Sequence, residues 1–151
     1  MAIVSQTGFG SEPTAIVLAQ DRCLRDGIID REAWRQTVFV PMSLVSDGKT
    51  HVIADEADFE KMMDDLQHYA TAHGITHIRT RISAHIGVSD NVATIPGLRD
   101  HMAGSERIAT ASMTFSVMRD SSGWRINQIH FNDHTADLSA MTQILRQSGE
   151  D

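Results

Sequence analysis

The sequence has little cysteine and no long apolar run, and both absences narrow the class of protein. Cys23 is the single cysteine in a chain of 151 residues, so no disulfide can form within the chain, as is usual in a reducing cytoplasm. No stretch approaches the roughly 20 apolar residues that a membrane span needs. Residues 1–10 also lack the basic and then apolar order of a signal peptide. We therefore expect a cytoplasmic protein with no membrane partner.

The chain also lacks a surplus of positive charge. It carries 20 Asp and Glu against 13 Lys and Arg, which gives a net charge of −7 at pH 7. A general nucleic-acid-binding protein would need a basic stripe to displace the counterions around phosphates. The cationic residues here form no such block, so we expect no nucleic-acid partner.

Motifs that identify a reaction are missing as well. The sequence contains no Gly-rich phosphate loop, no His-Glu-x-x-His, no Cys-x-x-Cys and no Gly-x-Ser-x-Gly, and no cofactor is expected. A metal site would need His130, Asn132 and His134 on one face of an extended strand. Because a helix must begin at Asp133 or Thr135, His134 leaves that line, and no metal is expected.

What the sequence does contain is an ordinary globular composition with a clear order of elements. Hydrophobic residues make up 41% of the chain, and neither a repeat nor a linker divides it, so we expect one domain over residues 1–151 with an ordered core at about 11–147. Turn, cap and periodicity signals in the first half predict, in order, a helix over 11–27, a shorter helix capped by Asp30, a strand over 38–45 that Pro41 makes an edge strand or a bulged one, a hairpin turn at 46–49, a return strand over 50–54 and a long helix over 55–74.

From residue 76 the apolar pattern changes to a period of two, which is typical of strands. Alternating segments at 76–86 and 107–119 flank a less regular strand over 92–102, which we expect to bend at Pro96-Gly97. A last strand follows the tight turn at 120–123, and a closing helix is predicted over 135–147. Alternation places on one face of that last strand the side chains of Trp124, Ile126, Gln128, His130 and Asn132.

The order of these elements resembles the nuclear transport factor 2-like superfamily, and within it the SnoaL-like group of polyketide cyclases and ketosteroid isomerase-like proteins. The resemblance covers roughly residues 11–147 and includes a helix ending near Asp26-Gly27, a Trp in the second helix, and the segments Gly123-Trp124-Arg125-Ile126 and His130-Phe131-Asn132-Asp133. It implies an α+β fold in which a cone-shaped, curved, mixed but mainly antiparallel sheet wraps around a long helix and leaves a conical pocket. It also implies a homodimer formed through the outer face of the sheet. The stripe that contains Arg79 and Arg81 could bind an anion, but we interpret it as part of this outer face.

The pocket that the resemblance implies would be mostly apolar, as small-molecule sites usually are. We expect it to bind an apolar small molecule, which Gln128 and His130 would orient. Its apolar wall is predicted to consist of Trp34, Met42, Met113, Phe115, Trp124 and Ile126.

An acid–base isomerase, cyclase or dehydratase is the alternative function. It would use His130 as the base, because a histidine exchanges protons near neutral pH, with Asp26 or Asp100 assisting. A structural histidine bonded to a backbone group competes with that interpretation. The interiors of the regular strands contain no carboxylate, which favours binding over catalysis. A third possibility is an accessory subunit, since the small subunits of aromatic-ring dioxygenases resemble the same superfamily.

Overall fold

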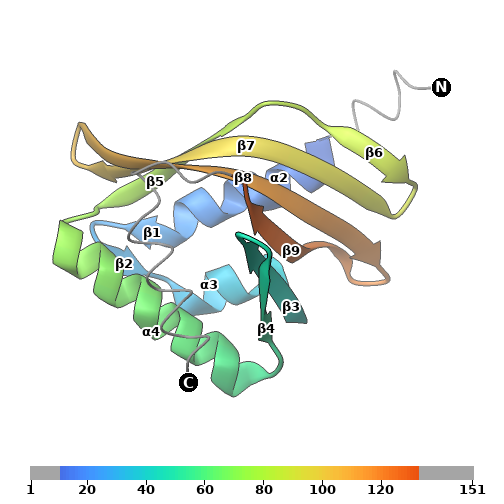
Figure 1. Cartoon of the computed structure of the whole chain (residues 1–151), viewed down its shortest axis with the longest axis horizontal. Coiled ribbons are helices and arrows are strands. Elements are labelled where there is room, and N and C mark those ends of the chain that lie inside the picture. Colours follow the sequence, from blue (N-terminus) through green and yellow to red (C-terminus); the bar gives the residue numbers. More distant parts are fainter. Residues whose placement is uncertain (1–10, 133–151) are drawn as a thin grey trace.

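The fold is built on an open, strongly curved sheet whose strands follow the order β4-β3-β9-β8-β7-β5, with β6 paired to β7 at the β5 side. The structure is a computed structural model that describes residues 11–132 (Figure 1). All neighbouring strands pair antiparallel except β3 and β9, which run parallel. The strands are β3 Val38–Ser46, β4 Lys49–Ile53, β5 His77–Ile82, β6 Ile86–Ser89, β7 Val92–Ala103, β8 Glu106–Asp120 and β9 Gly123–Phe131.

The long helix α4, Glu56–His73, lies across the concave side of this sheet (Figure 1). It begins where Asp55 accepts a hydrogen bond from the backbone N–H of Asp58 at 2.9 Å, and it ends at Gly74, whose φ of 67° only glycine adopts freely. The helix turns a single apolar stripe toward the sheet. The buried members of that stripe are Phe59, Met62, Met63, Tyr69 and Ala70.

The N-terminal segment departs from the predicted helix over 11–27. Helix α2, Ser11–Ala19, continues as the 3-10 helix η2, Gln20–Cys23, and is followed by a small hairpin of β1, Leu24–Arg25, and β2, Ile28–Ile29. Leu24 already has an extended backbone, and Asp26 and Gly27, with φ values of 51° and 82°, form the turn of that hairpin. Asp30 then caps the short helix α3, Arg31–Arg35, as predicted.

Strand β3 resolves the two possibilities that Pro41 left open. It lies between β4 and β9, so it is not an edge strand, and its register against β9 shifts between Val38 and Ser43. Proline has no N–H to donate to a ladder, and this irregular stretch accommodates it. The predicted hairpin turn is confirmed at Asp47 and Gly48, which both have positive φ.

The strands of the second half follow the predicted alternation, except that one predicted strand is interrupted. The strand predicted over 76–86 ends at Ile82 as β5, and a separate short strand, β6, begins at Ile86 and has all four residues exposed. In β8 the residues from Ala109 to Val117 alternate between buried and half-buried, so its apolar set faces the interior and its Ser and Thr residues form the outer face of the sheet. The predicted α+β fold, with a mixed curved sheet around a long helix, is confirmed.

The closing helix predicted over 135–147 lies outside the described residues. Within residues 11–132 no helix is both long and apolar enough to cross a membrane.

Gly97 provides a test of how closely β5 and β7 approach each other. A Cβ added at this position would lie 2.9 Å from the carbonyl oxygen of Arg81, a backbone atom that cannot move independently of the strand. We therefore expect Gly97→Ala to lower the free energy of unfolding by about 1–3 kcal/mol, the usual cost of overpacking, as measured by urea denaturation. Ser116→Ala on β8 is the control and should change stability much less. Equal effects of the two substitutions would contradict the close approach.

Candidate functional site

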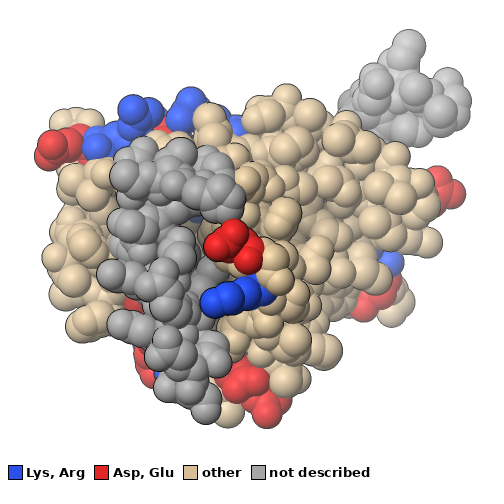
Figure 2. All heavy atoms as spheres, in the orientation of Figure 1, with Lys and Arg blue, Asp and Glu red and all other residues tan. Residues whose placement is uncertain are grey.

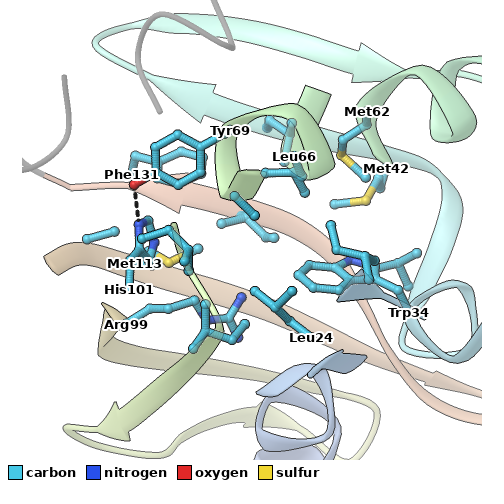
Figure 3. A pocket seen from close by; sticks show the side chains of 18 residues that line it. Leu24, Trp34, Met42, Met62, Leu66, Tyr69, Arg99, His101, Met113 and Phe131 are labelled. Atoms are coloured by element: carbon cyan, nitrogen blue, oxygen red, sulfur yellow. Dashed lines mark hydrogen bonds between the residues drawn. The ribbon is translucent and has the colours of Figure 1, made fainter. Parts of the chain in front are cut away.

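A cavity of about 80 Å³ lies inside the fold, between α4, the concave face of the sheet and the β1–β2 hairpin (Figure 3). Its wall is formed by 18 residues, of which all but three are apolar. The exceptions are Tyr69 of α4 and the β7 residues Arg99 and His101. Figure 3 shows these three at one end of the cavity, whereas Trp34, Met42 and Met62 lie at the other. The cavity therefore has one polar end and one apolar end.

Tyr69 and His101 are joined directly at the polar end. The hydroxyl oxygen of Tyr69 lies 2.7 Å from Nδ1 of His101 (Figure 3), and the two rings meet edge to face. Burial raises the pKa of Tyr69 to about 12. Burial, aided by the nearby positive charge of Arg99, lowers the pKa of His101 to about 4. Both groups are therefore neutral at neutral pH.

Arg99 brings a buried cation to the same end. Its side chain is 5% exposed, and its three nitrogens donate to Oγ1 of Thr80 at 2.8 Å, Oε1 of Gln20 at 2.9 Å and the carbonyl of Val17 at 3.4 Å. The guanidinium also lies 5.0 Å from the centre of the Phe115 ring. Burial lowers the pKa of Arg99 to about 10, which leaves the group charged at neutral pH.

The carboxylate of Asp21 lies near Arg99 but accepts its hydrogen bonds from Thr80. Oδ1 of Asp21 lies 3.7 Å from Nη2 of Arg99, which is beyond hydrogen-bonding distance. Both oxygens of Asp21 instead accept hydrogen bonds from Thr80, one from its backbone N–H and one from its hydroxyl, each at 2.7 Å. Arg99 is thus balanced in charge but makes no close ion pair.

Asp100 points to the opposite side of β7, because successive residues of a strand face opposite ways. It is fully buried on the outer face of the sheet beneath Arg79 and Arg81, and the hydroxyl of Thr110 also donates to it. Burial alone would raise the pKa of Asp100, but these hydrogen bonds lower it. Lys and Arg side chains gather along the rim above β5 and β7 in Figure 2. Asp100 therefore serves the outer face and does not line the cavity.

The predicted binding residues divide between the cavity and the core beside it. Trp34, Met42 and Met113 line the cavity. Three others are buried but lie outside its wall, because α2 packs against that part of the sheet. They are Phe115, which lies beneath Arg99, Ile126, and Trp124, whose indole N–H donates to Glu12 of α2 at 3.3 Å.

The face predicted for the end of β9 is wrong. Ser116 pairs with Gln128 and Val117 pairs with Ile126, so Asn127 is an extra residue in β9, a β-bulge. Beyond the bulge the two faces exchange, and Ile129 and Phe131 line the cavity. Gln128 and His130 face the outside of the sheet instead, and His130 is exposed. Ile129 and Phe131 were the signal in the sequence, because two apolar residues at odd positions interrupt the pattern of Trp124 and Ile126 at even positions.

The structure does not bring the two predicted catalytic residues together at the cavity. Asp26 is exposed in the β1–β2 turn, and neither it nor His130 belongs to the cavity wall. We did not predict from the sequence that Tyr69, Arg99 and His101 belong to the cavity wall. Alternation in β7 was the available signal, because it puts Arg99 and His101 on one face and Asp100 on the other. Over residues 11–132, no cluster of three or more His, Cys, Asp or Glu could hold a metal ion.

Comparison with protein families identifies one model that matches most of the chain. Residues 19–134 match the model described as NTF2-like protein (DUF6841). A search of curated proteins finds no match.

Solved structures with a similar fold come from several bacteria. An NTF2-like protein of unknown function from Shewanella oneidensis MR-1 is 19% identical, with a TM-score of 0.61, and the match covers 80% of this chain and 95% of that one. The function-unknown protein Rv3472 from Mycobacterium tuberculosis is 15% identical, with a TM-score of 0.62 over 98% and 92% of the two chains. A Nostoc punctiforme domain with a cystatin-like fold is 14% identical, with a TM-score of 0.58 over 91% and 93%. At these identities the likeness concerns the fold.

The lowered pKa of His101 predicts a loss of stability in acid. Below pH 6.5, the usual histidine pKa, the unfolded chain binds a proton at this position, whereas the folded protein does so only near pH 4. Stability contributed by the neutral ring is therefore lost as the pH falls through this window. Between pH 7 and pH 4 the wild type should lose about 3 kcal/mol more of its free energy of unfolding than His101→Gln does.

Urea denaturation at the two pH values measures this difference. His130→Gln is the matched control, since His130 is exposed, and it should follow the wild type. If His101→Gln and His130→Gln had the same pH dependence, the neutral buried state of His101 would be refuted.

Proposed function

This chain belongs to the family of NTF2-like proteins described as DUF6841, and we propose that it binds a small, mostly apolar molecule in the cavity beneath α4. The observation that carries the proposal is the composition of the cavity wall, which is apolar except for Tyr69, Arg99 and His101. Small-molecule sites commonly combine an apolar wall with a few polar groups that fix orientation. The exposed position of His130 gives no support to an acid–base reaction in the cavity through that residue.

The methionines provide a direct test of binding. Met42, Met62 and Met113 line the cavity from three different elements, whereas Met118 lies near the end of β8 with 39% of its surface exposed. We expect hexan-1-ol, a neutral and mostly apolar probe, to shift the methyl resonances of the three cavity methionines in a titration of protein with 13C-labelled methionine methyls. The Met118 resonance should stay in place. Equal shifts at Met118, or no shift at the cavity methionines at millimolar probe, would contradict the proposal.

A pair of alanines on neighbouring strands tests the cavity by filling it. Ala111 lines the cavity, whereas Ala93 is fully buried and does not. We expect Ala111→Val to weaken hexan-1-ol binding and to raise the free energy of unfolding by about 0.5–1 kcal/mol, because it fills empty space. Ala93→Val should instead lower stability by about 1–3 kcal/mol through overpacking and leave binding unchanged. Weaker binding in both variants would indicate a general distortion of the fold.

We also propose that the protein forms a homodimer through the outer face of the sheet. Supporting features are the half-buried Ser and Thr residues of β8, the exposed Ile108 and Met118 near its two ends, and the exposed arginines above Asp100. Together they give a broad face whose short side chains allow close approach, and methionine and arginine are residue types enriched in protein–protein interfaces.

Light scattering coupled to gel filtration tests this interface. We expect the wild type at micromolar concentration to have twice the 16.7 kDa mass of the chain. Ser116→Arg, which puts a long cation in the middle of the outer face, should shift the protein to monomer. Thr71→Arg on the exposed side of α4 is the control and should remain dimeric. A monomeric wild type would overturn the proposal.

A further inference from the structure

The polar end of the cavity differs from the rest of its wall in charge as well as polarity. Arg99 and His101 are two residues apart on β7 and therefore face the same side of the strand, about 6–7 Å apart along it. Both line the cavity; in Figure 3 the imidazole of His101 lies beside Tyr69, and the side chain of Arg99 extends from the same strand toward Leu24. A ligand that fills this part of the cavity can therefore reach both side chains.

Arg99 has hydrogen-bonding capacity beyond its contacts with the protein. A guanidinium carries five N–H donors, and three hydrogen bonds from Arg99 reach other described residues. The carboxylate of Asp21 lies 3.7 Å away and is held by Thr80. A buried cation gains most from a carboxylate in direct contact, particularly when two parallel hydrogen bonds form.

His101 supplies a second donor beside the guanidinium. When the Tyr69 hydroxyl donates to Nδ1 of the neutral ring, the proton of that ring is on Nε2. No residue of the described chain hydrogen-bonds to Nε2. The two groups of β7 then both present N–H donors, so the complementary ligand group is an acceptor, and the positive charge of Arg99 selects an anionic one.

We propose that the natural ligand is a small monocarboxylic acid with an apolar tail, bound with its carboxylate between Arg99 and His101 and its tail toward Trp34 and Met42. The proposal rests on the proposed binding function and adds the chemical class of the ligand. The apolar end of the cavity contributes affinity by burying the tail. The β7 pair contributes selectivity, because a neutral head group on the same tail would leave the guanidinium with its contacts to the protein alone.

Calorimetric titrations with hexanoate, hexanamide and hexan-1-ol at pH 7 test the ligand class. The three probes share nearly the same tail, and only hexanoate is charged. We expect hexanoate to bind at least about tenfold more tightly than hexanamide, as a charge-assisted hydrogen bond in a buried site implies. Arg99→Gln should bring the two affinities within about threefold of each other, and Arg107→Gln, which removes an exposed arginine of β8, should leave the preference unchanged.

A second measurement needs no substitution in the buried network. Tyr69 and His73 of α4, together with Arg99 and Asp100 of β7, are the titratable groups around His101. A carboxylate added to this environment favours the charged imidazole and should raise the pKa of His101 in an NMR titration of the wild type. Hexanamide should leave this pKa unchanged.

The outcomes separate the two proposals. Hexan-1-ol that shifts the cavity methionines, combined with no preference for hexanoate and an unchanged His101 pKa, would overturn the carboxylate assignment and leave apolar binding intact. Hexanoate that binds without shifting Met42, Met62 and Met113 would place the anion on the surface and also overturn the assignment. If no probe reached the cavity methionines, the binding function itself would fail.

Discussion

Much of the interior is organised around the burial of one cation, the guanidinium of Arg99. A buried charge is costly unless polar groups surround it, and those groups come from separate parts of the chain: Val17 and Gln20 of the N-terminal helices and Thr80 of β5. Gln20 in turn donates to the hydroxyl of Thr37, which immediately precedes β3, at 3.0 Å. The network thereby fixes the N-terminal segment against the sheet and closes one end of the cavity with polar partners.

Strand β7 separates charges by alternation. Its three successive polar residues are all buried, yet Arg99 and His101 serve the interior while Asp100 serves the outer face under Arg79 and Arg81. The outer side holds one carboxylate beside two arginines, whereas the inner side holds the guanidinium of Arg99 with Asp21 at 3.7 Å. The interior can therefore keep His101 neutral while Asp100, one residue away, stays charged.

The sequence allowed the elements to be predicted where local chemistry decided the structure. The caps at Asp55 and Gly74, the turn at Asp47-Gly48 and the alternation in β8 each specify a conformation through a few neighbouring residues. The cavity residues Tyr69, Arg99 and His101 could not be found in the same way, because their meeting depends on how α4 lies across the sheet. The small hairpin at Asp26-Gly27 was missed for a related reason: a helix end and a tight turn share the same glycine signal.

The bulge at Asn127 determines which residues at the end of β9 point into the cavity. On either side of it the strand alternates regularly, but the extra residue inverts which half of the alternation is turned inward. If the same residues paired with β8 without the bulge, Ile129 and Phe131 would point outward, and Gln128 and His130 would point into the cavity. The chemical character of this part of the cavity thus depends on the bulge as much as on the residues in the strand. Regular pairing of the unchanged sequence would give the same fold a more polar pocket.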